Sequence, residues 1–138
     1  APGTPEFDLF VAEVVNEMTV KAGQKCTAIR RAMVPGAFLD AAEQAIAERL
    51  AGTRVGDPRE KESRMGALVS RAQRDSVREA VAAITAAGAR VAAGDPDGRL
   101  GPDGGAFMPP VLLRADDPGA GGAPHDVDPS DPAATLMP

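Results

Sequence analysis

The sequence predicts an α/β fold, with a largely parallel sheet flanked by helices and a C-terminal part rich in glycine and proline. Over residues 1–94, helical patterns alternate with short apolar runs that suit buried strands. From residue 95 onward, Gly and Pro supply 16 of 44 residues, a composition typical of loops. The chain of 138 residues is long enough for one domain or a piece of one.

The first helix is predicted over residues 4–18, TPEFDLFVAEVVNEM. Thr4 can cap it and Pro5 suits its first turn. Spacings of three and four place the apolar side chains on one face, formed by Phe7, Phe10, Val11, Val14, Val15 and Met18. Gly23 is a natural stop. Residues 27–35, TAIRRAMVP, are then predicted to form a strand that Pro35 ends.

The second helix is predicted over about residues 36–50, with a buried face of Phe38, Leu39, Ala42, Ile46 and Leu50. After a polar connection over 52–66, Ser70 and Gln73 have the spacing of a capping box and announce a third helix. That helix ends at Gly88 and buries Val77, Val81 and Ile84.

Three further strands are predicted over residues 89–94, 106–114 and 133–138. Pro109 and Pro110 confine the second of these to an edge of the sheet or to its own start, because proline cannot donate a ladder hydrogen bond. The apolar run at 133–138 needs strand partners, and it suggests that the chain is an excised portion of a larger domain.

Composition and charge exclude several classes of function. Apolar residues make up 43% and charged residues 25%, which is ordinary for a globular protein. No apolar run approaches the roughly 18 residues that span a bilayer, and no signal peptide is recognisable. Residues 1–94 carry 13 Lys and Arg against 12 Asp and Glu, and residues 95–138 carry 2 against 8, which argues against nucleic acid as a partner. A single cysteine cannot form an internal disulfide, so the cytoplasm is the expected location.

That cysteine, Cys26, is open to two interpretations. A free cysteine is usually a small buried hydrophobe. Against this, Gly23 permits a tight turn before it, and a helix-to-strand junction is a common place for reactive groups. Cations nearby can favour the thiolate if they point inward, although we expect at least two of the four to be solvated; they are Lys21, Lys25, Arg30 and Arg31.

Residues 17–31, EMTVKAGQKCTAIRR, resemble the nucleophile segment of the aldehyde dehydrogenase superfamily, in which Gly-Gln and one variable residue precede the catalytic cysteine. The likeness continues through VGDPREKESRMGALVSRAQR, GAFMPPVLLR and PAATLMP. Within the superfamily, the sequence is most similar to the dehydrogenase domain of the bifunctional ring-opening proteins of phenylacetate catabolism, which pair it with an oxepin-CoA hydrolase domain.

The resemblance implies a fragment of an aldehyde dehydrogenase catalytic domain, with residues 1–94 as a helix and strand core and 95–138 as acidic loops and edge strands. It implies that Cys26 attacks an aldehyde, with a CoA-linked semialdehyde as the substrate class, to form a thiohemiacetal. It also implies that the Cys26 backbone N–H helps to stabilise the oxyanion. Hydride would then pass to NAD or NADP. No metal is implied, and the full-length protein is expected to be a homo-oligomer.

The sequence departs from the family in two respects. It contains neither the Glu-Leu-Gly type segment of the general base, nor the asparagine oxyanion donor, nor a dinucleotide-binding half, so the isolated fragment is expected to be inactive. The family has Glu-x-Phe-Gly-Pro before its last strand, where this sequence places Asp128, Ser130 and Asp131. Asp128 is the remaining candidate for binding the cofactor ribose.

Other interpretations stay open. The departures at 128–131 favour a degenerate remnant that serves only packing or assembly. Cys26 and His125 suggest a hydrolase dyad, although they lie far apart in the sequence and the histidine sits in a Gly/Pro-rich stretch. The aspartates after residue 94 lack the spacing of a calcium loop, and GPDGG at 101–105 is expected to be a turn.

Overall fold

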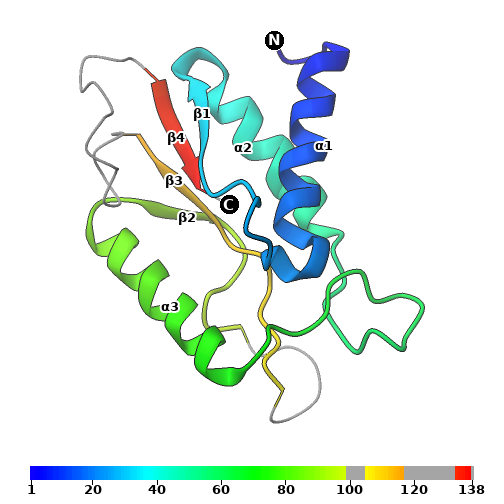
Figure 1. The fold of residues 1–138 in the computed structure, drawn as a ribbon. Coiled ribbons are helices and arrows are strands. Elements are labelled where there is room, and N and C mark those ends of the chain that lie inside the picture. The colour runs from blue at the N-terminus through cyan, green and yellow to red at the C-terminus, as the bar shows by residue number, and fades with distance from the viewer. Residues whose placement is uncertain (99–104, 117–132, 138) are drawn as a thin grey trace.

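The computed structural model describes residues 1–98, residues 105–116 and the backbone of 133–137 (Figure 1). Its elements in chain order are α1 (Pro5–Thr19), the short 3-10 helix η1 (Val20–Gly23), β1 (Ala32–Pro35), α2 (Gly36–Ala51), α3 (Arg71–Ala86), β2 (Arg90–Ala93), β3 (Leu112–Ala115) and β4 (Ala133–Met137). The predicted α/β class is confirmed: helices flank a small sheet. None of the described helices is long and apolar enough to cross a membrane.

The predicted helices form where their capping residues and periodicity place them. The Thr4 hydroxyl accepts a hydrogen bond from the Phe7 N–H at 3.3 Å, and the Ser70 hydroxyl accepts one from the Gln73 N–H at 3.0 Å. Each bond satisfies an N–H of the first turn that has no partner within the helix. These signals are local in sequence, which is why the sequence locates the helix starts well.

The strands pair differently from the prediction. The sheet has the order β1-β4-β3-β2, and all three pairings of these strands are antiparallel. The largely parallel sheet that the sequence predicted is therefore wrong for the described strands. A parallel pair needs a crossover, usually a helix, between its strands. Between β2 and β3, the described parts of the connection contain no helix, and the chain returns beside itself in the opposite direction.

The position of the C-terminal strands also needs correction. They were predicted as edge strands, but β3 and β4 lie inside the sheet, and β1 and β2 form its edges. Pro109 and Pro110 precede β3, so they limit where the strand starts and not its place in the sheet. The strand predicted over 27–35 is reduced to β1, because residues 24–31 form a loop in which the Ala28 N–H bonds the Lys25 carbonyl at 3.2 Å.

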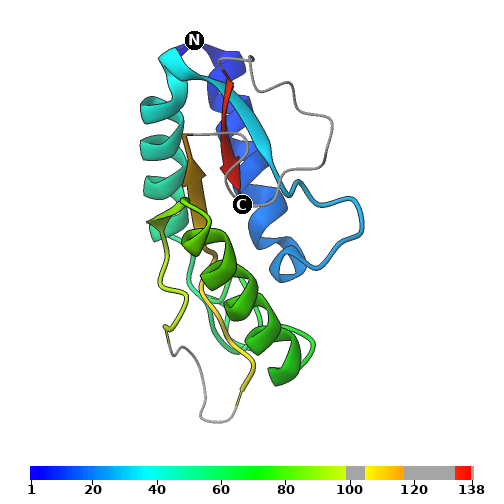
Figure 2. The same cartoon turned by 90° about the vertical axis from the view of Figure 1, so that its left-hand side faces the viewer.

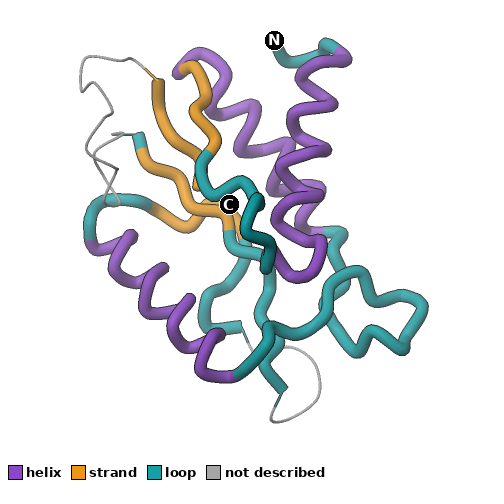
Figure 3. The backbone as a smooth tube through the Cα atoms, viewed as in Figure 1, coloured by secondary structure: helices purple, strands orange, loops and turns teal. Residues whose placement is uncertain are grey.

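Two apolar clusters lie on opposite faces of the sheet. Leu112 of β3 packs with α1 and α2, in the cluster that contains Val11 and Ile46. Its neighbour Leu113 packs with Val81 of α3, as expected from the alternation of side chains along a strand. Figure 1 shows α1 and α2 side by side and α3 on the other side of the sheet; in Figure 2 the pair lies in the upper part and α3 below. The long loop over residues 52–70 joins α2 to α3 (Figure 3).

An ion cluster fastens α2 to the sheet. The Arg114 guanidinium of β3, only 14% exposed, donates to Asp40 at 2.5 Å, to Glu43 at 2.7 Å and to Asp116 at 2.7 Å. Arg90 of β2 donates to both carboxylate oxygens of Glu43, at 2.8 and 2.6 Å. Bidentate pairs of this kind are geometrically specific. Glu43 is therefore the carboxylate through which one helix contacts two strands.

This cluster predicts a specific loss of stability in acid. Partial burial raises the pKa of Glu43, but hydrogen bonds from Arg90 and Arg114 outweigh it and bring the pKa below the ordinary 4.5. The stabilisation from ionised Glu43 is thus complete above about pH 4.5 and is lost as the pH falls through the lower pKa of the folded state. In urea unfolding, the drop in stability between pH 7 and pH 3 should be smaller for Glu43→Gln than for the wild type. Equal drops would contradict this assignment.

Candidate active site

Cys26 lies in an exposed loop, residues 24–31, between η1 and β1; we call it the Cys26 loop. The chain enters this loop through a left-handed turn in which Lys21, Ala22 and Gly23 have φ of 53°, 54° and 68°. Left-handed backbone costs roughly 1–2 kcal/mol for a residue with a side chain. A Cβ at Gly23 would lie 3.3 Å from the Met18 carbonyl oxygen, so glycine suits this position. The turn is strained, and the surrounding contacts must stabilise it.

Gln24 connects the Cys26 loop to a distant part of the chain. Its side-chain amide donates to the Lys21 carbonyl at 3.1 Å, and its Oε1 accepts the N–H of Val69 at 2.8 Å. Val69 directly precedes Ser70, the cap of α3. One side chain thus ties the turn before Cys26 to the entrance of α3.

Two of the neighbouring cations also fasten the loop. Lys25 forms a half-buried ion pair with Glu17 of α1, with 2.6 Å between Nζ and Oε1. Arg30 donates from Nη1 to the Gly23 carbonyl and from Nη2 to the Lys25 carbonyl, each at 3.0 Å. These two side chains were expected either to favour the thiolate or to be solvated. Arg30 is exposed, as expected for a solvated cation, and the contacts of both side chains also fix the backbone around Cys26.

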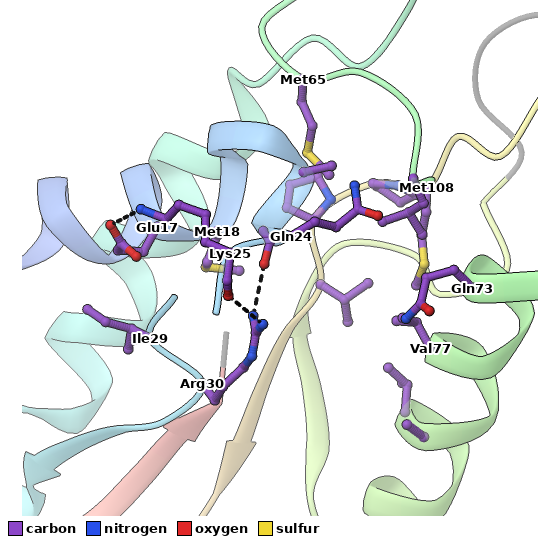
Figure 4. A pocket seen from close by; sticks show the side chains of 18 of the residues that line it. Glu17, Met18, Gln24, Lys25, Ile29, Arg30, Met65, Gln73, Val77 and Met108 are labelled. Atoms are coloured by element: carbon purple, nitrogen blue, oxygen red, sulfur yellow. Dashed lines mark hydrogen bonds and ion pairs between the residues drawn. The ribbon is translucent and has the colours of Figure 1, made fainter. Parts of the chain in front are cut away.

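A groove of about 760 Å³ opens beside Cys26, and we call it the Cys26 groove (Figure 4). The Cys26 loop lines one side of it and α3 lines the other, where Gln73 and Val77 face it. Three methionines from separate parts of the chain contribute to its wall, namely Met18, Met65 and Met108. Methionine is flexible and polarizable, so such a wall can adapt to apolar groups of different shape.

The backbone N–H of Cys26 has no acceptor among the described residues, whereas Gln24, Lys25 and Ala28 all donate to backbone carbonyls of the same turn. The thiol and an N–H that has no acceptor in the described part of the chain thus belong to one exposed residue that lines the groove. A nucleophile beside a free amide donor is the arrangement required for addition to a carbonyl, because the oxygen gains negative charge as the bond forms.

Several predicted residues lie outside the described part of the chain: His125, Asp128, Ser130 and Asp131. Of the GPDGG segment, only Gly105 is described. Asp95 is described and forms a turn, with its carboxylate accepting the Asp97 N–H at 3.0 Å. Within the described ranges, no three or more His, Cys, Asp and Glu side chains come together as a metal site would require.

The sequence did not reveal the contacts of Gln24 and Arg30. The bond between Gln24 and Val69 spans 45 residues, and Arg30 was judged only by its charge. No periodicity or motif in the sequence indicates either contact, because each forms only in the three-dimensional arrangement of the turn before Cys26.

The described residues do not fit a dinucleotide. Such cofactors are bound where a strand runs through a Gly-rich turn into a helix. β1 leads directly into α2, but no Gly-rich turn lies between them: the strand ends at Pro35 and the helix begins at Gly36. No side chain caps the start of this helix. The described part of the chain therefore lacks the turn that would hold the cofactor's pyrophosphate.

Comparison with known proteins gives a consistent result. The model of the aldehyde dehydrogenase family matches residues 4–120. The 3,4-dehydroadipyl-CoA semialdehyde dehydrogenase of Aromatoleum evansii is 46% identical over 140 aligned positions, which cover 99% of this chain and 27% of the relative.

Solved structures agree in fold. Betaine aldehyde dehydrogenase from Staphylococcus aureus in complex with NAD+ is 28% identical with a TM-score of 0.71, over 78% of this chain and 22% of that one. A mutant of aldehyde dehydrogenase C from Pseudomonas syringae, complexed with NAD+ and octanal, is 25% identical with a TM-score of 0.68, over 80% and 23%. The chain thus spans about a quarter of the length of these proteins. The family match over residues 4–120 and the shared fold show that this chain belongs to the aldehyde dehydrogenase family.

Proposed function

We propose that this chain is the nucleophile-bearing part of an NAD- or NADP-dependent aldehyde dehydrogenase, with Cys26 as the catalytic residue. The observation that carries the proposal is the exposed Cys26 at the groove, with its own N–H free of acceptors among the described residues. The proposed substrate is a CoA-linked semialdehyde, because the relative that is 46% identical is named for one. The resemblance to the ring-opening proteins of phenylacetate catabolism supports aromatic-ring breakdown as its source.

The part of the reaction assigned to this chain is addition to the aldehyde. The Cys26 thiol gives its proton to solvent water, and the resulting thiolate forms a C–S bond to the aldehyde carbon. The π pair of the C=O bond moves to oxygen, and the resulting oxyanion of the thiohemiacetal accepts a hydrogen bond from the Cys26 N–H. When bound in the whole enzyme, NAD or NADP supplies the acceptor for hydride.

The same proposal covers the domain organisation. Residues 1–138 are a fragment of the catalytic domain, with a core over 1–94 and a Gly/Pro-rich part over 95–138. The sequence has no Glu-Leu-Gly type base segment, so the isolated chain should not oxidise aldehydes. We also propose a cytoplasmic location, which suits the single thiol, and a homo-oligomeric full-length protein.

Labelling of the folded chain tests whether Cys26 is available as a nucleophile. We expect iodoacetamide to alkylate native Cys26 within about tenfold of its rate in urea, since the side chain is exposed. Peptide mass spectrometry measures the rates, and Cys26→Ser is the control that should take no label. Native protein that resists labelling while the urea-unfolded protein reacts would contradict the proposal and favour a packing role.

A further inference from the structure

We propose that Arg30 is a positioning residue that orients the backbone N–H of Cys26 by fixing the peptide plane between Lys25 and Cys26. The inference rests on the proposed role of Cys26 as nucleophile and adds a residue to that site. Arg30 has no part in the chemistry itself; it acts through the backbone carbonyls that it binds.

The contacts of Arg30 converge on the turn before the thiol (Figure 4). One guanidinium donates to the Gly23 carbonyl through Nη1 and to the Lys25 carbonyl through Nη2, both at 3.0 Å. The guanidinium is planar and rigid, so two bonds from it fix the relative direction of the two carbonyls. The Lys25 carbonyl also accepts the Ala28 N–H at 3.2 Å, which gives this oxygen two donors.

The geometry of the peptide unit transmits this constraint to Cys26. The carbonyl of Lys25 and the N–H of Cys26 belong to the same planar unit, and in a trans peptide they point in opposite directions. A carbonyl that is held toward Arg30 therefore holds the Cys26 N–H on the opposite side of the plane. That N–H is the one that finds no acceptor among the residues described around it.

The charge of Arg30 adds to the geometric effect. A cationic donor makes the stronger kind of hydrogen bond. Bonds in series polarise one another, so a positive donor at the carbonyl makes the N–H of the same peptide a better donor. Arg30 is solvent-exposed, so we expect its two bonds to contribute little to global stability. Their effect should appear in the reactivity of Cys26 toward carbonyl compounds.

Two reactions of the Cys26 thiol distinguish an effect of Arg30 on the orientation of the N–H from an effect on access to the sulfur. Alkylation by iodoacetamide displaces iodide at a saturated carbon and forms no oxyanion. In acylation by p-nitrophenyl acetate, the thiolate adds to the ester carbonyl, the oxygen takes the π pair, and collapse expels p-nitrophenolate. Only the second reaction needs the donor. The ratio of the two rate constants therefore reports on the Cys26 N–H.

The variants are Arg30→Met, which keeps the apolar stem, and Arg30→Lys, which keeps the charge without the fork. Arg71→Met is the matched control, because Arg71 is exposed and is not among the residues that line the Cys26 groove. We expect Arg30→Met to lower the acylation rate constant at least about tenfold and the alkylation rate constant less than about twofold. Arg30→Lys should recover part of the acylation, and Arg71→Met should match the wild type. A parallel fall of both rates, or no change in either, overturns the proposal.

The NMR signal of the Cys26 backbone amide tests the positioning role of Arg30 without relying on acylation. In ¹⁵N relaxation, Arg30→Met should lower the order parameter of that amide from about 0.85 to below about 0.6, and Arg71→Met should leave it unchanged. If the wild-type chain shows no acylation but the amide responds in this way, the proposed nucleophile fails and the positioning role stands. An amide unaffected by Arg30→Met overturns the positioning role.

Discussion

Gly94→Ala is expected to destabilise the chain by about 3 kcal/mol or more. Gly94 follows β2 with φ of +82°, and a Cβ there would lie 2.2 Å from the Pro110 carbonyl oxygen and 3.1 Å from the Val111 Cα. Both are backbone atoms of the two residues just before β3, so no rotation of a side chain relieves the clash. The added methyl group must push β3 away from β2, which separates the edge strand β2 from the rest of the sheet.

Urea unfolding of Gly94→Ala and Gly3→Ala distinguishes the clash from the left-handed backbone. Gly3 has φ of +81°, nearly the same as Gly94, but nothing lies within 4 Å of the position of its Cβ. Its substitution should therefore cost only the conformational part, roughly 1–2 kcal/mol. Similar losses for the two variants would show that the contact with Pro110 does not limit this position.

Ile46→Ala should cost about 3 kcal/mol, within the range for removing a large aliphatic side chain from a core. Ile46 is 0% exposed and lies on α2, in the cluster that joins α1, α2 and β3. Its neighbours there include Val11 and Leu112, which are also almost fully buried. The chain has few aromatic side chains, 3% of its residues, so each large aliphatic one carries more of the core.

The measurement is again urea unfolding, with Leu9→Ala as the matched control. Leu9 is 61% exposed on α1, so truncation at that site should change stability by no more than about 0.5 kcal/mol. The slope of the transition should stay constant, since both variants unfold to the same state. A loss at Ile46 as small as that at Leu9 would mean that α2 does not pack on the sheet as described.

The parts of the fold that the sequence predicted are those with local causes. Thr4 and Ser70 announce helix starts because their hydroxyls bond N–H groups three residues away. The predicted direction of the strands was wrong, because strand pairing joins residues far apart in the sequence, such as Leu113 of β3 and Val91 of β2. Alternation of helix and strand favoured parallel pairing only as long as a helix was assumed between successive strands.

The site follows the same rule. The motif GQKC located the thiol, and the structure places that thiol in an exposed loop. The partners that fix the loop are Glu17, Arg30 and the backbone of Val69, and they bind only once the turn has formed. From its charge alone, Lys25 was predicted to favour the thiolate or to be solvated. Its ion pair with Glu17 depends on the position of α1 and could not be predicted in this way.

The bond between Gln24 and Val69 also bears on how the protein is made. Synthesis proceeds from the N-terminus at about 5–20 residues per second, so the 45 residues that separate the two partners take roughly 2 to 9 seconds to appear. During that interval the segment with Cys26 has already been synthesised, but Val69, which binds Gln24, has not. Forming a contact between residues this far apart in the sequence costs more chain entropy than forming one between residues close in the sequence. We therefore expect the thiol to acquire its folded environment late in biogenesis, only after residue 69 has been synthesised.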